Sequence, residues 1–386
     1  MAKPTIRFKG YTEDWEQRKL GDVFKEYSEK KHTELPALTI IQGGGTVKRE
    51  DSDRNLMYDE SNLSNYKMVQ KDDFIVHLRS FEGGLEKSSL DGIISPAYHT
   101  FHSDVADSRF YYPYFRSHEF IKHKLVPHVY GIRDGRSIDV AGMKTIEIPY
   151  TSMEEQRKIG DYLDSLDHLI TLHQRKCEET KTLKKYMLQK MFPQNGQKVP
   201  EIRFKGFTED WEQRKLDDWG TFYYGRSCPK WSVTEDATIP CIRYGELYTK
   251  FGAKIDKVYS YTNMSPENLR FSKGTEVLIP RVGEDPMDYN HCTWLSMPDV
   301  AIGEMISVFN TDNNPLFTAT MFNATLQNEF AMRVEGGSVT NLYFEKLKNI
   351  EVSFPSLNEQ ERIATYFDSL DHLITLHQRI SLYFFK

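Results

Sequence analysis

Apolar residues follow a helical spacing through residues 154–191. They recur in alternating steps of four and three positions, which is a heptad-like seam. The seam consists of Ile159, Leu163, Leu166, Ile170, His173, Cys177 and Thr180. Pro193 and Gly196 then stop the pattern. We expect one long helix of roughly 50 Å, at about 1.5 Å per residue.

The same seam returns near the end of the chain. Its members are Ile363, Phe367, Leu370, Ile374, His377 and Phe384. Two such helices related by a two-fold axis across their length would pair antiparallel. His173 and His377 have no second ligand at i+4, so we expect them to be packing residues rather than metal ligands.

These seams belong to an internal repeat. Residues 6–20 recur as residues 202–216 with 14 of 15 positions identical, at an offset of 196. Residues 164–175 recur as residues 368–379 with all 12 positions identical, at an offset of 204. Chance does not produce such matches, so the chain contains an internal duplication. We call the repeated segments of each copy its frame and the residues between them its interior. In each copy we expect the tryptophan and the last leucine of the short repeat to pack against the domain that follows.

The interiors framed by these repeats differ from each other. Residues 21–145 and 217–349 show no comparable identity. Drift after a duplication would blur the frames as well as the interiors. The contrast therefore indicates two copies of one partner on the frames and two different ligands on the interiors.

Both interiors contain short strand-like runs bounded by turn residues, which predicts α/β domains. The runs lie at residues 35–41, 72–78, 92–99, 275–280 and 301–303. The loops that connect these runs contain glycine close to arginine or lysine. Such loops can approach a phosphate backbone or present an arginine to a guanine edge. Residues 109–136 add six basic residues against two acidic ones. The competing interpretation of that segment is a buried aromatic helix with a basic outer face.

The composition narrows the class of protein. Charged residues make up 27% and hydrophobic ones 39% of the 386 residues, which fits a soluble globular chain of two or more domains. We see no secretory signal and no apolar run of about 18 residues, so we expect no membrane span. The four cysteines are widely spaced, which argues against a zinc site and suits the cytosol. The net charge of −6 requires local basic patches or a partner if the chain binds DNA.

Motifs of catalysis are missing from the sequence. There is no G-x-x-x-x-G-K-[ST] phosphate loop, no H-E-x-x-H and no G-x-S-x-G. We therefore expect a binding scaffold with no catalytic residue and no metal ligand. Two other hypotheses stay open at this point: a stand-alone coiled-coil adaptor with two ligand-binding domains, and a nuclease with an unrecognised acidic site.

The motifs occur in one order in both halves. Ile-Arg-Phe-Lys-Gly and Trp-Glu open each half, and Glu155–Ile159, echoed as Glu359–Ile363, precedes the Asp-Ser-Leu-Asp helix. Leu188–Phe192 closes the first helix. This order resembles the specificity (S) subunit of bacterial type I restriction–modification enzymes over essentially the whole chain.

The resemblance implies an α+β fold with an internal pseudo-two-fold repeat. Two α/β target-recognition domains would be joined by two long antiparallel coiled-coil helices. The expected bounds are 1–150 for the first domain, 151–192 for the first helix, 193–354 for the second domain and 355–386 for a shortened second helix. The second helix leaves the repeat after Arg379, so the counterpart of residues 182–192 is absent or replaced.

The resemblance also implies the partners. Each domain would read one half of a split site in double-stranded DNA, and the frames would dock two methyltransferase (M) subunits, joined by restriction (R) subunits. We expect no cofactor on this chain, with S-adenosylmethionine, ATP and Mg on the partner subunits, and a cytoplasmic location.

Candidate contact residues come from the interior loops and the repeated helices. The candidate DNA contacts are Thr46, Lys48, Arg49, Arg79, Ser80, Arg133, Arg136, Arg226, Ser227, Lys230, Arg243, Tyr244 and Arg281. The candidate partner contacts are Leu166, Leu169, Ile170, Leu172, Leu370, Leu373, Ile374 and Leu376.

Overall fold

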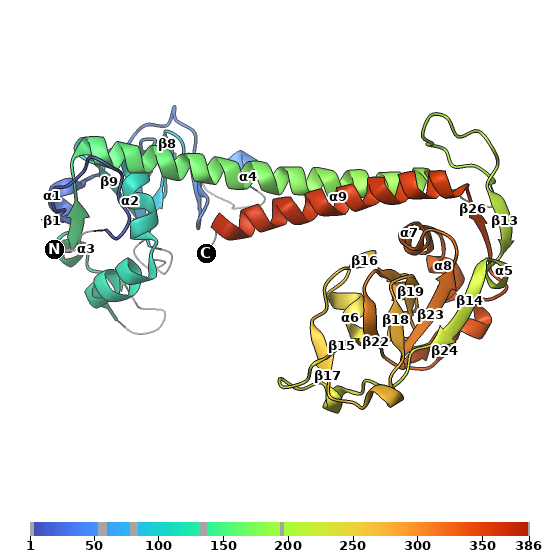
Figure 1. Cartoon of the computed structure of the whole chain (residues 1–386). Coiled ribbons are helices and arrows are strands. Elements are labelled where there is room, and N and C mark those ends of the chain that lie inside the picture. The colour runs from blue at the N-terminus through green and yellow to red at the C-terminus, as the bar shows by residue number, and fades with distance from the viewer. Residues whose placement is uncertain (1–3, 53–59, 78–83, 132–136, 194–196, 385–386) are drawn as a thin grey trace. The chain divides into compact units, whose positions relative to one another are not determined.

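The chain divides into two compact units, Met1–Thr171 and Leu172–Lys386 (Figure 1). The computed structural model describes residues 4–52, 60–77, 84–131, 137–193 and 197–384. Both units combine short strands with helices, which confirms the mixed α/β character that was predicted.

The first unit is built around a four-stranded antiparallel sheet. Its strands, in spatial order, are β2 (Lys25–Tyr27), β9 (Tyr98–His102), β6 (Phe74–His77) and β7 (Glu86–Lys87). Helix α2 (Ser108–Phe115) begins at Asp107, whose carboxylate accepts a hydrogen bond from the Arg109 amide at 2.9 Å. The aromatic rings of α2 share one buried core with strands β6 and β9.

The remaining elements of the first unit pair locally. They are β1 (Glu16–Lys19), α1 (Leu20–Val23), β3 (Leu38–Ile41), β4 (Gly45–Lys48), β5 (Lys67–Val69), β8 (Gly92–Ile94), β10 (Val129–Tyr130), β11 (Ser137–Ile138), α3 (Val140–Met143) and β12 (Glu147–Tyr150). The antiparallel pairs are β1–β12, β3–β4, β5–β8 and β10–β11. The run predicted over 92–99 forms two strands, β8 and β9, because Pro96 between them cannot donate to a strand ladder.

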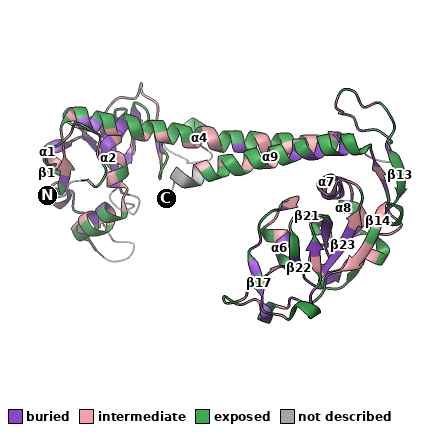
Figure 2. Ribbon diagram, viewed as in Figure 1, coloured by how far each residue is buried: buried purple, intermediate pink, exposed green. Residues whose placement is uncertain are grey.

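The second unit contains two larger sheets. The five-stranded sheet is ordered β14 (Gly220–Tyr224), β23 (Ile306–Thr311), β19 (Glu276–Pro280), β21 (Thr293–Leu295) and β16 (Lys254–Ile255). The four-stranded sheet is ordered β17 (Ser260–Thr262), β15 (Ile239–Ile242), β22 (Pro298–Ile302) and β18 (Phe271–Lys273). Strand β19 fulfils the prediction over 275–280 and is buried at all five positions. Figure 2 shows the buried colour concentrated on these inner strands.

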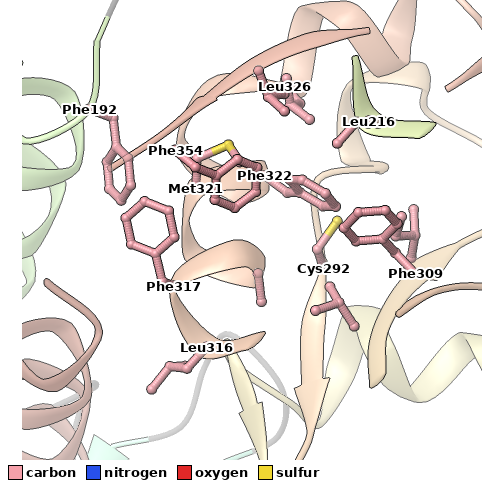
Figure 3. Close-up of a cluster of buried hydrophobic side chains, with 14 of the residues drawn as sticks. Phe192, Leu216, Cys292, Phe309, Leu316, Phe317, Met321, Phe322, Leu326 and Phe354 are labelled. Atoms are coloured by element: carbon pink, nitrogen blue, oxygen red, sulfur yellow. The ribbon is translucent and has the colours of Figure 1, made fainter. Parts of the chain in front are cut away.

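Helix α7 (Pro315–Thr325) fills the core of the second unit. Asn314 begins the helix by accepting a hydrogen bond from the Phe317 amide at 3.0 Å. The rings of Phe317 and Phe322 then pack among Phe192, Phe309 and other apolar side chains (Figure 3). Burial of each such ring stabilises the unit by about 1.5–3 kcal/mol.

Shorter elements complete the second unit. They are β13 (Glu212–Lys215), α5 (Leu216–Trp219), α6 (Tyr244–Thr249), β20 (Val282–Gly283), α8 (Gln327–Ala331), β24 (Glu335–Gly336), β25 (Thr340–Asn341) and β26 (Glu351–Phe354). Trp211 and Leu216 lie in the core of this unit, and Leu20 with Trp15 in that of the first, as predicted.

Two long helices are present, α4 (Met153–Lys190) and α9 (Leu357–Phe384). The helix predicted over 154–191 is therefore confirmed as α4. Helix α9 stays helical beyond Arg379, where the sequence leaves the repeat.

Within the second unit, the last part of α4 lies along α9 (Figure 1). His173 Nδ1 is 2.9 Å from His377 Nδ1, and Lys184 Nζ is 2.5 Å from a carboxylate oxygen of Asp371. The residue number rises along α4 while that of its partner falls along α9. This part of the pair is therefore antiparallel, as predicted.

The basic segment over 109–136 is largely an aromatic packing element. It comprises α2 and a π-helical segment, Glu119–Leu125, with Phe115 and Phe120 fully buried. Arg109 is 2.6 Å from a carboxylate oxygen of Asp161, and Arg116 pairs with Glu86. Because these two arginines are already paired, the structure favours the interpretation of a buried aromatic helix.

Candidate DNA interface

Four of the candidate DNA contacts line one pocket in the second unit. Ser227 and Lys230 come from the connection between β14 and β15, while Arg243 and Tyr244 lie where β15 meets α6. The turn between β22 and β23, which includes Glu304, completes a pocket of about 220 Å³. The four residues thus come from two separate loops and carry hydroxyl, ammonium, guanidinium and phenol groups. Such donors bind phosphate oxygens and base edges.

The backbone of this pocket is tightly held. Ser227 and Cys228 have φ angles of 63° and 65°, a region that costs a non-glycine residue about 1–3 kcal/mol. The amide of Glu304 donates to the carbonyl oxygen of Ser227 at 3.0 Å. A Cβ atom at Gly225 would lie 2.1 Å from the carbonyl oxygen of Gly303. Contacts with the β22–β23 turn therefore force the loop into this strained conformation.

A buried carboxylate fixes the backbone at Arg243. Glu246 accepts a hydrogen bond from the Arg243 amide at 2.9 Å and another from the Ser260 hydroxyl at 2.7 Å. Among the residues that the structure describes, no carboxylate forms an ion pair with the Arg243 guanidinium. Sequence reasoning missed Glu246, because a single glutamate in a short helix carries no recognisable spacing.

Arg281 lies near the pocket but is held by the protein. Its guanidinium stacks on the rings of Tyr224 and Tyr343, at 4.7 and 5.5 Å from their centroids. It also donates to the carbonyl oxygen of Glu304 at 3.3 Å. Burial and the neighbouring Glu345 raise the pKa of Tyr224 to about 12, so this ring stays neutral. In this structure Arg281 supports the pocket wall, and Arg226 is an exposed cation beside it.

Unlike the four residues of the pocket in the second unit, the described candidate residues of the first unit line neither of two large pockets in that unit. Lys48 is exposed at the end of β4, with its nearest carboxylate, Glu50, at 3.7 Å. The Arg49 guanidinium lies 5.2 Å from the ring centroid of Tyr66. Thr46 is buried, and its hydroxyl is 3.0 Å from that of Ser88. Thr46 therefore anchors the β3–β4 hairpin and does not face a ligand.

Four candidate residues fall outside the described part of the chain. They are Arg79, Ser80, Arg133 and Arg136. The loops that contain them were expected to contact DNA, and that expectation stays a prediction.

A second buried carboxylate supports the glycine-rich hairpin of the first unit. Glu86 accepts a hydrogen bond from the Gly43 amide at 2.7 Å and one from the Tyr112 hydroxyl at 2.9 Å. It also pairs with Arg116. Glu86 was missed in the sequence because its partners are 26 to 43 positions away.

The frames repeat one ion pair in each unit. Arg7 donates from Nε and Nη2 to the two carboxylate oxygens of Glu155, at 2.6 and 2.8 Å. Arg203 makes the same two contacts with Glu359, both at 2.7 Å. Burial alone would raise the pKa of Glu155, but hydrogen bonds from Arg7 and Thr151 bring it below its usual value. We call these two ion pairs the frame clamps.

Neighbouring contacts repeat in the same register. The Gln156 side chain accepts a hydrogen bond at 2.9 Å from the amide of Asp107, the N-cap residue of α2. The Gln360 side chain accepts one at 2.9 Å from the amide of Asn314, the N-cap residue of α7. Strands β1 and β12 pair Glu16 with Tyr150, and β13 and β26 pair Glu212 with Phe354. The repeated Glu-Gln dipeptides were visible in the sequence, and a search for charge pairs between the repeated segments would have found the clamps.

A known family matches most of the chain. The family described as type I restriction modification DNA specificity domain matches residues 12–182 and 297–382, about two-thirds of the chain. The chain belongs to this family. A relative named as a putative type I restriction enzyme MjaX specificity subunit, from Methanocaldococcus jannaschii, is 24% identical over 252 residues, or 63% of this chain. The match spans 56% of that relative, so the chain covers about half of its length.

Solved structures of specificity subunits share the fold. The S subunit from M. genitalium gives a TM-score of 0.58 at 16% identity, covering 98% of this chain and 95% of that one. The HsdS subunit from Thermoanaerobacter tengcongensis gives 0.50 at 16% identity, covering 97% and 95%. A chain from work on complex assembly and conformational transition of the type I R-M system gives 0.50 at 17% identity, covering 96% and 93%.

The candidate docking residues of this specificity-family chain divide into buried and exposed positions. Leu370 is buried in the core of the second unit. Leu373 and Leu376 are 41% and 42% exposed, and Leu169, the repeat counterpart of Leu373, is 40% exposed. The half-buried candidates are Leu166, Ile170, Leu172 and Ile374. Leu169 and Leu373 therefore have equal exposure in the two copies, whereas Leu370 is more buried than its counterpart Leu166 and Leu376 more exposed than its counterpart Leu172.

Two negative findings concern the described residues alone. Within the described ranges, no helix is long and apolar enough to cross a membrane. No group of three or more His, Cys, Asp or Glu side chains in that part of the chain could hold a metal ion.

Proposed function

We propose that this chain is the DNA sequence-recognition subunit of a type I restriction–modification enzyme. The observation that carries the proposal is the pocket of Ser227, Lys230, Arg243 and Tyr244, on a chain of the specificity family. The pocket is lined by residue types that bind phosphates and bases, and the scaffold around it differs between the two units. The family match favours this function over a stand-alone coiled-coil adaptor.

The contacts of each unit support a division of labour. The interiors, within proposed domains 1–150 and 193–354, each read one half of an asymmetric bipartite site. The frame clamps stand at equivalent positions, and we assign the frames to two identical methyltransferase subunits. The exposed pair Leu169 and Leu373 supplies one apolar contact for each of them.

The helix pair supports an internal pseudo-two-fold axis. His173 and His377 are equivalent residues of the repeat, and they contact each other at 2.9 Å. In an antiparallel pair of equivalent helices, a residue meets its own counterpart only where the two-fold axis crosses the pair. We therefore assign spacer helices to residues 151–192 and 355–386 and place the axis at this histidine pair.

The chain itself supplies recognition in this proposal and no catalysis. S-adenosylmethionine, ATP and Mg belong to the methyltransferase and restriction subunits, and the assembly works on DNA in the cytoplasm. The acidic chain depends on those subunits for much of the electrostatic attraction to DNA.

A binding assay tests the proposal. The chain is expressed with and without its methyltransferase subunits, and binding to duplex libraries is measured at several salt concentrations. We expect sequence-specific binding by the assembled complex. Tight binding of a ligand other than nucleic acid by the isolated chain, or metal-dependent DNA cleavage by it, would refute the proposal.

A further inference from the structure

Trp231 is an exposed tryptophan beside the pocket of the second unit. It lies in a 3-10 turn, Lys230–Ser232, with 71% of its surface exposed. The other four tryptophans of the chain are buried or half-buried. One exposed apolar side chain is common on protein surfaces. Two further features indicate a ligand: the turn that carries this ring is fixed by hydrogen bonds, and cations and aromatic rings lie in the same region of the unit.

The turn that carries Trp231 is anchored on both sides. Ser232 is fully buried, and its hydroxyl donates to the carbonyl oxygen of Pro229 at 2.8 Å. The Thr262 hydroxyl donates to the Ser232 hydroxyl oxygen at 2.8 Å, and the Asn263 amide donates to the Ser232 carbonyl oxygen at 3.0 Å. The indole therefore projects from a fixed base, and less conformational entropy is lost when it binds.

The surroundings of Trp231 suit a nucleic acid. Lys230 precedes it and lines the pocket with Arg243. Thr262 of strand β17 anchors the turn, and Tyr261 in that strand and Tyr259 just before it are exposed as well. Two lysine amines each lie 5.3 Å from the Tyr259 centroid. Aromatic rings interleaved with cations are typical of surfaces that stack bases and track a phosphate backbone.

We propose that Trp231 stacks its indole on a nucleobase of the DNA bound at this pocket, an inference that rests on the proposed function. The pocket donors would identify the base pairs. The indole would add affinity by contact with the face of a base, unstacking that base from its neighbour. Every base has a π-face, so this contribution tolerates different sequences. A tryptophan in this position also bends or opens the duplex at the contacted step.

The test uses the chain assembled with its methyltransferase subunits and a duplex that carries the motif methylated by the wild-type complex. Trp231→Ala should weaken binding roughly 5- to 150-fold, the range that loss of one base–aromatic stack gives. Trp231→Phe should keep most of the affinity because it keeps a planar ring, whereas Trp231→Leu should not. Met332→Ala is the matched control, since Met332 is 70% exposed in the same unit.

A spectroscopic readout separates stacking from general loss of binding. Single 2-aminopurine substitutions are placed along the half-site and its flanks. The wild-type and Trp231→Phe complexes should change the fluorescence at one position, because the base there exchanges stacking on its neighbour for stacking on the ring, and saturated complexes of Trp231→Ala should not.

Each other outcome has a distinct meaning. Specific wild-type binding that Trp231→Ala leaves within twofold, with the same fluorescence pattern, would overturn the stacking inference and leave the proposed function intact. Failure of Trp231→Ala to assemble with methyltransferase would make Trp231 a protein contact and also overturn it. Absence of specific binding by the wild-type complex would instead refute the proposed function.

Discussion

The frames of this chain are held by the same contacts in both copies, whereas the two interiors are held by different contacts. The two frame clamps, Arg7–Glu155 and Arg203–Glu359, repeat one geometry with contacts between 2.6 and 2.8 Å. In the described parts of the interiors, the loops share no such repeated contact. A glycine hairpin held by Glu86 serves the first unit, and a strained turn at residues 227–228 serves the second. Under the proposed function, the identical contacts serve a shared partner and the different loop supports serve different ligands.

The largest expected effect comes from breaking one clamp. Glu359→Ala leaves the half-buried Arg203 without its carboxylate, and we expect the second unit to lose about 3–5 kcal/mol of its free energy of unfolding. Chemical denaturation of the chain measures this loss. Glu361→Ala, at an exposed position of the same helix, is the control and should change stability by less than about 0.5 kcal/mol. Equal stability of the two variants would show that the clamp does not support the frame.

A second test disturbs one interior and spares the frame. Gly225→Ala puts a Cβ atom 2.1 Å from a backbone oxygen, so we expect the pocket loop to shift at a cost of about 1–3 kcal/mol. Specific binding should weaken through the half-site read by the second unit, as a duplex binding assay would show. Gly245→Ala is the control, because nothing lies within 4 Å of its added atom. Similar behaviour of both variants would contradict the tight approach at Gly225.

Charge removal in the two interiors sharpens the comparison further. Arg243→Ala should weaken binding by about 1–3 kcal/mol, with the loss confined to duplexes that carry the second unit's correct half-site. Lys48→Ala should weaken binding for all sequences and reduce the slope of affinity against salt by about one. Competition binding at several salt concentrations measures both. A uniform loss for Arg243→Ala would assign that residue to a phosphate.

The smallest effect concerns the histidine pair on the helices. Burial, His173 and Lys176 lower the pKa of His377, so the folded chain favours the neutral imidazole. The stability that this preference provides is complete above the unfolded value of about 6.5 and declines as the pH falls below it. Denaturation at neutral pH and at about pH 5.5 measures how much the free energy of unfolding falls on acidification. This decrease should be smaller for His377→Gln than for the wild type. His372→Gln, exposed on the same helix, should behave as the wild type.

The repeat, the long first helix, the antiparallel pairing and the family were all predictable from the sequence. They rest on local spacing and on identity between segments, which a single chain displays. The pocket was predictable only as a set of loops, because its closure depends on the β22–β23 turn more than 70 residues after Ser227. The roles of Thr46 and Arg281 could not be predicted. Burial of one and aromatic stacking of the other arise from tertiary contacts that composition does not reveal.

The most direct test of the two-reader account is an exchange of one interior. Residues 217–349 are replaced by the corresponding interior of another specificity-family chain, and the DNA methylated by the assembled complex is mapped by single-molecule sequencing. The account predicts that one half of the methylated motif changes while the other half stays the same. A change in both halves, or in neither, would contradict it.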